Sequence, residues 1–112
     1  MKTKPIIHFA AAALLGAGAV LALPAAADEL AAGKTKAQSC AVCHGAKGIS
    51  QMPGAPNLAG QNAIYVTEQL KNYRSGKRSN EIMNVIAKPL TDAEIANLAA
   101  WFESIKIQVA TE

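Results

Sequence analysis

The chain has 112 residues, with 11 Lys and Arg against 8 Asp and Glu, and a formal net charge of +3. That length allows one small domain and excludes a doubly wound sheet or a two-domain enzyme. A chain this short often needs a metal, a disulfide or a cofactor to complete its core. Residues 1–27, which we expect to be removed, contain two of the lysines, and without them the net charge is +1. The basic footprint of a nucleic-acid-binding protein is then lacking, so we expect no nucleic-acid partner.

Residues 1–27 have the pattern of a secretory signal peptide. Two lysines precede an apolar run over residues 6–23, and the small residues Ala25 and Ala27 form an A-x-A cleavage pattern before an acidic pair. The run is nearly long enough to span a bilayer, so a retained membrane anchor is the alternative. We favour cleavage, which predicts a mature domain of residues 28–112 exported to the periplasm.

After the leader, apolar residues recur at helical spacing, without the alternation typical of strands. Residues 30–43 are expected to form the first helix. Residues 45–60 are rich in glycine and contain two prolines, which predicts a long loop. Residues 62–75 place their apolar side chains on one face, and Gly76 is a natural residue to end that helix.

Two further helices are expected before the C-terminus. Residues 80–87 form a short candidate that ends before Pro89. Residues 91–105 begin with a capping-box pattern, Thr91 followed three residues later by Glu94. The expected fold class is therefore all-α, with three main helices, one short helix and a long loop.

The segment Cys40-Ala41-Val42-Cys43-His44 is a C-x-x-C-H motif, the attachment signature of c-type haem. Two thiols at this spacing add to the two vinyl groups of the porphyrin, and His44 is then held under the iron as its proximal ligand. The motif predicts one covalent haem c with its iron, around which the helices wrap. The apolar porphyrin would also compensate for a shortage of aromatic residues.

Two cysteines at this spacing have three other known uses in proteins. A thioredoxin-like redox pair requires a βαβ context, which the sequence does not show. A zinc site requires four ligands, whereas residues 28–112 offer two Cys and one His. A structural disulfide at this spacing closes a loop too small to stabilise much. Haem attachment is therefore favoured.

The second axial ligand is narrowed by elimination. Once residues 1–27 are removed, His44 is the only histidine, so the donors that remain are Met52, Met83, a lysine or none. Met52 lies eight residues after His44, a separation that could reach ~26–29 Å when extended, so length does not exclude it. Met83 lies on a separate element and can approach from the opposite face, so it is favoured. Met52 would then fill a gap in the core or be exposed.

A proximal imidazole usually donates its other N–H to a carbonyl, which orients the ring and tunes the iron. The loop after His44 contains Pro56, whose carbonyl is a candidate acceptor in this second shell. Spacing alone is equally compatible with a simple turn at Pro56 and Asn57.

The chain resembles a class I c-type cytochrome, most closely one haem domain of the bacterial cytochrome c-four type. Besides the C-x-x-C-H motif, the resemblance is carried by residues 56–61, Tyr65, residues 69–70, residues 73–78, Met83, residues 90–92 and residues 98–102.

The resemblance implies a class I cytochrome c fold whose first and last helices cross, with Gly33 allowing close approach near Leu98 and Trp101. It also implies Met83 as the distal iron ligand and the Pro56 carbonyl as the acceptor from His44. The c-four type carries two haem domains in tandem whereas this chain has one, so partners are not carried over from it.

The expected function is that of a periplasmic electron-transfer protein rather than an enzyme. His/Met ligation saturates the iron and leaves no position for a small-molecule substrate, so the partners would be redox proteins that bind transiently. Contact with a membrane would occur only through membrane-bound redox partners. The alternatives are a haem-bearing subunit of a larger dehydrogenase or oxidase, and a haem sensor or peroxidase with a labile distal ligand.

A basic cluster lies at and beyond the end of the helix over residues 62–75. It could steer an acidic partner, pair with the haem propionates, or suit the negative end of the helix dipole. Its members are Lys71, Arg74, Lys77 and Arg78.

Overall fold

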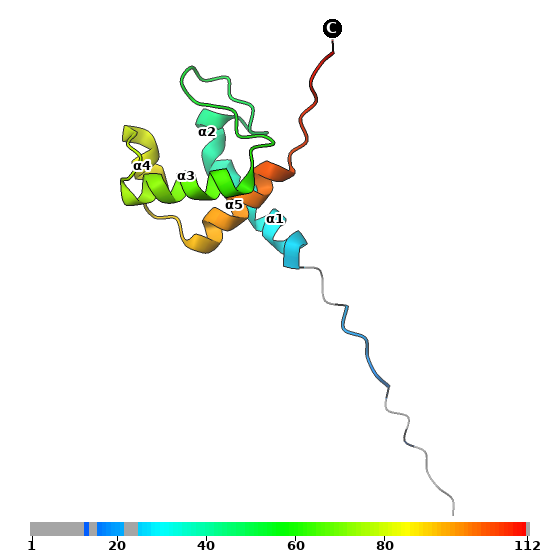
Figure 1. Ribbon diagram of the computed structural model, residues 1–112. Helices are drawn as coiled ribbons and strands as arrows, with labels where there is room; N and C mark the ends of the chain where they lie inside the picture. The colour runs from blue at the N-terminus through cyan, green and yellow to red at the C-terminus, as the bar shows by residue number, and fades with distance from the viewer. Residues whose placement is uncertain (1–12, 14–15, 22–24, 112) are drawn as a thin grey trace, which may run out of the picture.

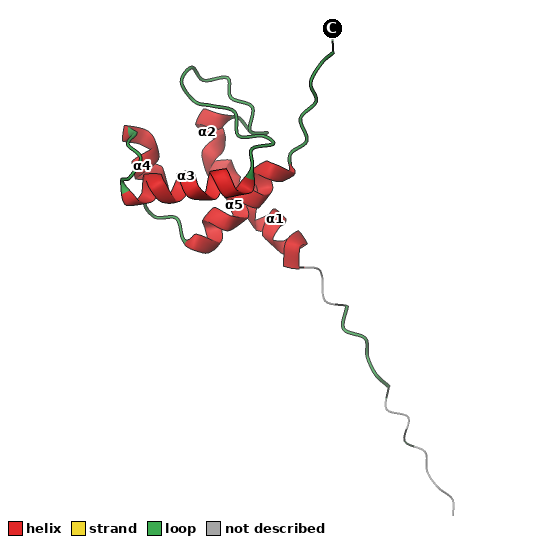
Figure 2. Cartoon of the chain, in the orientation of Figure 1, coloured by secondary structure: helices red, strands yellow, loops and turns green. Residues whose placement is uncertain are grey.

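The computed structural model describes residue 13, residues 16–21 and residues 25–111 (Figure 1). These residues form helices joined by loops, with no strand among them (Figure 2), so the predicted all-α class is confirmed. None of the helices in this described part is long and apolar enough to cross a bilayer. The elements are α1 (Ala25–Lys36), the 3₁₀ helix η1 (Ala37–Cys40), α2 (Ala41–His44), α3 (Ala63–Ser75), α4 (Glu81–Ala87) and α5 (Asp92–Ser104).

Helix α1 begins earlier than the expected start at Leu30. The alanines at positions 25–27 are helical, because alanine has the highest intrinsic helix propensity, and residues 25–29 are all exposed. The helix then runs almost without interruption through η1 and α2 to His44. Most of the predicted signal peptide lies outside the described residues.

The helix ends follow the signals in the sequence. The Asn62 side chain accepts from the backbone N–H groups of Ile64 and Tyr65 at 2.9 and 3.2 Å, which starts α3. Gly76, in the left-handed region at φ 82°, ends it. Thr91 and Glu94 make both bonds of the predicted capping box at the start of α5.

Helices α1 and α5 cross in direct contact at Gly33. A Cβ atom at this position would overlap the carbonyl oxygen of Asn97 and lie 2.9 Å from Cβ of Trp101. The missing side chain therefore allows the two backbones to approach closely. An ion pair between Nζ of Lys36 and Oε1 of Glu94, at 2.8 Å, also joins the two helices. The crossing expected from the resemblance is confirmed.

The core is built on one face of α5. Ile95, Leu98 and Phe102 are buried there, while Ile105 is only partly buried. Ala37 from η1 and Ala87 from α4 complete the centre of this cluster together with Leu90. Ile95 and Leu98 are the only large side chains in the described part of the chain with less than 2% exposure. The polypeptide alone therefore provides a small core.

Candidate functional site

The C-x-x-C-H motif closes the first helical segment. Cys40 is the last residue of η1, and Cys43 and His44 end α2. Residues three apart lie on the same side of a helical turn, so this geometry suits two thiols that attach to one flat group. Both cysteines are half-buried. Gly45, at φ 83°, then turns the chain out of the helix.

His44 is the only buried polar or charged residue in the described part of the chain, at 8% exposure. Its Nδ1 lies 2.8 Å from the carbonyl oxygen of Pro56. A carbonyl oxygen can only accept, so Nδ1 carries the proton and donates it. The lone pair of this imidazole is then on Nε2, the nitrogen that points away from the Pro56 bond. This is the tautomer that a metal-ligating histidine requires.

The loop over residues 45–60 is fixed by its own hydrogen bonds. The backbone N–H of Ser50 donates to Oδ1 of Asn57 at 2.8 Å, and the Ser50 hydroxyl lies 2.9 Å from the carbonyl oxygen of Cys43. The N–H of Gly60 donates to the carbonyl oxygen of Phe102 at 2.8 Å, which ties the end of the loop to α5. These bonds present the Pro56 carbonyl to His44 from a defined position.

The two candidate methionines lie on different elements. Met83 is half-buried on α4, and its backbone N–H donates to Oδ1 of Asn80 at 2.9 Å. Met52 is 43% exposed in the loop that leaves His44. In Figure 1, α4 lies at the C-terminal end of α3, whereas α2, which carries His44, lies apart from it.

Several large apolar side chains near these elements are left uncovered by the polypeptide. Val42 in the motif is 82% exposed, Ile64 on α3 is 77% exposed, and Ile82 and Val85 on α4 are 61% and 70% exposed. A small core, uncovered apolar side chains and a ligand-ready imidazole together fit a large apolar cofactor.

The basic cluster divides into two kinds of residue, and the first kind is structural. Arg74 donates from Nη1 to the carbonyl oxygen of Leu90 at 2.9 Å and pairs through Nη2 with Oδ1 of Asp92 at 2.6 Å. The hydrogen bond from Arg74, with the charge of that guanidinium, lowers the pKa of Asp92. Arg74 therefore links α3 to the start of α5, a role that sequence reasoning missed because both partners are distant along the chain.

Arg78 is also engaged within the domain, since it donates to Oε1 of Gln69 at 2.9 Å and lies over the Tyr73 ring, 4.6 Å from the ring centre. Lys71 and Lys77 are exposed, and neither makes an ion pair in the part of the chain that the structure describes. Of the four cluster residues, these two lysines are therefore the ones without a side-chain partner in the described part of the chain.

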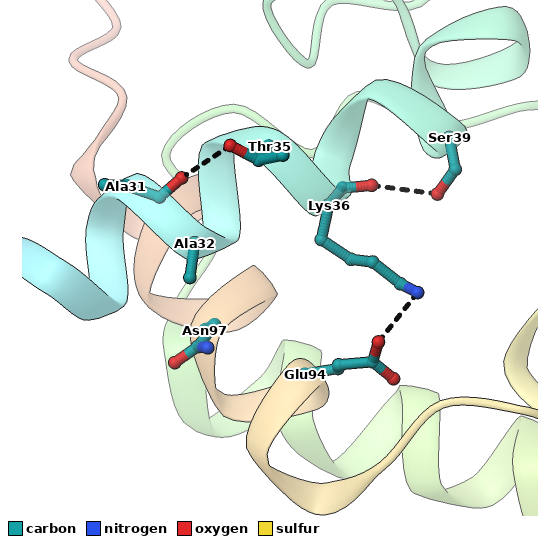
Figure 3. A pocket seen from close by; sticks show the side chains of 7 residues that line it. All are labelled: Ala31, Ala32, Thr35, Lys36, Ser39, Glu94 and Asn97. Atoms are coloured by element: carbon teal, nitrogen blue, oxygen red, sulfur yellow. Dashed lines mark hydrogen bonds and ion pairs between the residues drawn. The ribbon is translucent and has the colours of Figure 1, made fainter.

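An open groove lies between α1, η1 and α5 (Figure 3), and one of its lining residues, Ser39, directly precedes Cys40. Most of its polar side chains have partners close by: Lys36 pairs with Glu94, Thr35 donates to the carbonyl oxygen of Ala31, and Ser39 donates to that of Lys36. The side chain of Asn97 alone among the polar lining residues makes no hydrogen bond in the described part of the chain. The groove therefore offers no converging set of unsatisfied groups to a ligand.

The family model described as cytochrome c matches residues 30–106. The chain belongs to the cytochrome c family. It therefore carries covalently attached haem c with its iron, and Cys40, Cys43 and His44 form the family's C-x-x-C-H motif. Electron transfer is the activity of this family.

Among curated relatives, cytochrome c4 of Pseudomonas aeruginosa is 42% identical over 84 residues, which cover 75% of this chain and 42% of that protein. Cytochrome c-554(548) of Halomonas halodenitrificans is 40% identical over 81 residues, or 70% of this chain and 98% of that protein. A thiosulfate dehydrogenase electron acceptor of Thiomonas intermedia is 39% identical over 83 residues, or 73% of this chain and 38% of that protein. The chain thus spans less than half of the first and third relatives and nearly all of the second.

The fold is also similar to solved structures. A cytochrome c4 from Acidithiobacillus ferrooxidans superposes with a TM-score of 0.66 at 34% identity, covering 69% of this chain and 49% of that one. The predicted class I cytochrome c fold and the resemblance to one haem domain of the c-four type are confirmed.

Proposed function

We propose that this protein is a periplasmic single-electron carrier, in which Cys40 and Cys43 hold the haem through thioether bonds and His44 and Met83 are the axial ligands of its iron. The haem supplies the one-electron couple. The observation that carries the proposal is the bond from Nδ1 of His44 to the Pro56 carbonyl oxygen at 2.8 Å. This bond orients the imidazole, leaves Nε2 for the iron and increases the basicity of the ring.

The same bond favours Met83 over Met52. The loop over residues 45–60 lies on the Nδ1 side of His44, because it carries Pro56. If Nε2 of His44 binds the iron, a second protein ligand would have to come from an element on the other side of the haem. Met52 belongs to the proximal loop and is bonded through its backbone N–H to the Ser50 hydroxyl at 3.1 Å. Met83 is on a separate helix and is free of that restriction.

Saturated coordination determines the kind of chemistry. If His44 and Met83 both bind the iron, it would have no position for a substrate, and the protein would transfer electrons without being an enzyme. Methionine as the sixth ligand also raises the reduction potential. Partners would be redox proteins that bind transiently at an exposed part of the cofactor, and no small-molecule substrate is required.

Export fits the sequence before the domain. Removal of residues 1–27 would leave Asp28 at the N-terminus and take away only exposed residues at the start of α1. The family match begins later, at residue 30. N-terminal sequencing of the protein from the periplasm should begin at Asp28, whereas an intact leader in the membrane fraction would contradict export as a mature domain.

A dehydrogenase is the class of donor that we favour. The Thiomonas intermedia relative is a thiosulfate dehydrogenase electron acceptor. Purification from the native periplasm should yield a protein that separates from its donor at moderate salt. Stable co-purification with a larger dehydrogenase or oxidase would instead indicate a permanent subunit.

Two measurements test the cofactor and its ligands. The mass of the secreted protein should equal that of the polypeptide plus one haem, whereas free or mutually oxidised cysteines would contradict attachment. The oxidised holoprotein should show the weak red absorption band of methionine sulfur on ferric haem. Met83→Ala should abolish this band and Met52→Ala should retain it. The reverse result, or a high-spin spectrum of the unmodified protein, would overturn the ligand assignment.

A further inference from the structure

The side chain of Asn84 makes three hydrogen bonds to backbone groups around the start of α4. Its Nδ2 donates to the carbonyl oxygen of Tyr73 at 2.7 Å and to that of Arg78 at 2.8 Å. Its Oδ1 accepts from the backbone N–H of Asn80 at 2.6 Å. The orientation of the amide is determined by these partners, because a reversed amide would face two carbonyl oxygens with its own oxygen. One side chain thus joins the end of α3, the following turn and the first turn of α4.

Asn84 accepts the bond that the third helical residue accepts in a capping box, although Asn84 is the fourth residue of α4. In α5 the capping box is made by Thr91 and by Glu94, the third helical residue. In α4 the N-cap is Asn80, so the third helical residue is Met83. If Met83 is reserved for the iron, its side chain cannot accept from the N-cap N–H. Asn84, one residue later, makes that bond instead.

Helix α4 needs such a tether. It has seven residues, and helices this short are marginal in water without tertiary contacts. At its C-terminal end Ala87 is fully buried in the core. Near its N-terminal end Ile82 is 61% exposed, so apolar packing against the polypeptide does not anchor the turn that carries Met83. The amide of Asn84 is the group that fastens this turn to α3.

We propose that Asn84 is a positioning residue that holds the turn of α4 bearing Met83, and thereby determines how readily an external ligand displaces the Met83 sulfur from ferric haem. The proposal rests on Met83 being the distal ligand. Displacement requires the turn to move away from the iron. The bonds of Asn84 to Tyr73 and Arg78 oppose that movement, because they join the turn to groups outside it. The bond to Asn80 holds the first turn of α4 together.

The test is a titration of the ferric holoprotein with imidazole, followed by loss of the red methionine band. Asn84→Ala and Asn84→Leu remove all three bonds, and Leu keeps a similar side-chain volume. Both residues are better helix formers than asparagine, so any weakening cannot come from helix propensity. Both variants should bind imidazole about tenfold more tightly than the unmodified protein, as expected for the loss of one or two net hydrogen bonds.

The matched control is Asn97→Ala on α5, because the Asn97 side chain makes no hydrogen bond in the described part of the chain. This variant should bind imidazole with an affinity within about twofold of that of the unmodified protein. Titrations are made well below the unfolding temperature of every variant. Imidazole affinities of both Asn84 variants within twofold of the unmodified protein would overturn the proposal. If Met83→Ala keeps the red band, the ligand assignment fails first; if it loses the band while the Asn84 variants behave normally, only the role of Asn84 fails.

Discussion

Nδ1 of His44 and the carbonyl oxygen of Pro56 lie 2.8 Å apart, although the residues are twelve positions apart along the chain. The acceptor is a backbone atom, so no substitution of Pro56 removes it directly. The loop that presents it can be loosened instead, because Oδ1 of the adjacent Asn57 accepts from the N–H of Ser50 at 2.8 Å. The role of His44 as the proposed proximal ligand is therefore open to test through Asn57, a residue that is not bonded to His44.

Asn57→Ala should raise the reduction potential of the holoprotein. A weaker bond at Nδ1 makes the imidazole a poorer donor, which destabilises ferric more than ferrous iron. The shift should stay below about 60 mV, the value for a tenfold change in a one-electron couple. Spectroelectrochemical titration measures it. Gln51→Ala, an exposed change in the same loop, is the control, and equal potentials for the two variants would contradict this role of the loop.

Gly33→Ala should destabilise the domain by about 1–3 kcal/mol or more, since the added methyl group overlaps the Asn97 carbonyl at the crossing of α1 and α5. The gain in helix propensity, about 1 kcal/mol, does not offset this overlap. Denaturant unfolding of the holoprotein gives the difference. Ala32→Ser, at an exposed neighbouring position, should change stability little. Full stability of Gly33→Ala would mean that the helices do not meet as described.

Glu94 should contribute acid-sensitive stability. The hydrogen bond from Lys36, together with the backbone bond from Thr91, lowers the pKa of Glu94 below its ordinary value of 4.5. A carboxylate with a lowered folded pKa stabilises the fold above pH 4.5, and this contribution is lost as the pH falls through the folded pKa. Between neutral pH and acid, Glu94→Gln should therefore lose less stability than the unmodified holoprotein. Glu68→Gln, at an exposed site, is the control and should lose as much stability between neutral pH and acid as the unmodified holoprotein does. Parallel curves of unfolding free energy against pH for all three proteins would refute the prediction.

Lys71 and Lys77 should govern the charge dependence of electron transfer. Changing both to Glu should slow oxidation of the reduced holoprotein by ferricyanide severalfold at 10 mM salt and hardly at all at 1 M, because the screening length falls from about 30 Å to about 3 Å. Stopped-flow absorbance gives the rates. Lys34→Glu with Lys106→Glu makes the same net charge change on other segments and should have a smaller effect. If the oxidation rates of the unmodified protein and both double variants are independent of salt, Lys71 and Lys77 do not steer the partner.

Much of the fold was predictable from local pattern. The start of α3 at Asn62, its end at Gly76 and the capping box of Thr91 with Glu94 all depend on residues within one turn of each other. The C-x-x-C-H motif is equally local. The start of α1 was misplaced, because the prediction required an apolar pattern and the alanines at positions 25–27 form a helix by propensity alone.

The sequence by itself determined the helices, the haem-attachment motif and the prediction of His44 as an iron ligand, since each follows from residues close together along the chain. The tertiary structure decided that Arg74 bonds to Leu90 and Asp92. It also decided that Asn84 bonds to Tyr73, and that Nδ1 rather than Nε2 of His44 meets Pro56. The physical reason is that a hydrogen bond is specified by the positions of two atoms in space, and separation along the chain does not specify those positions.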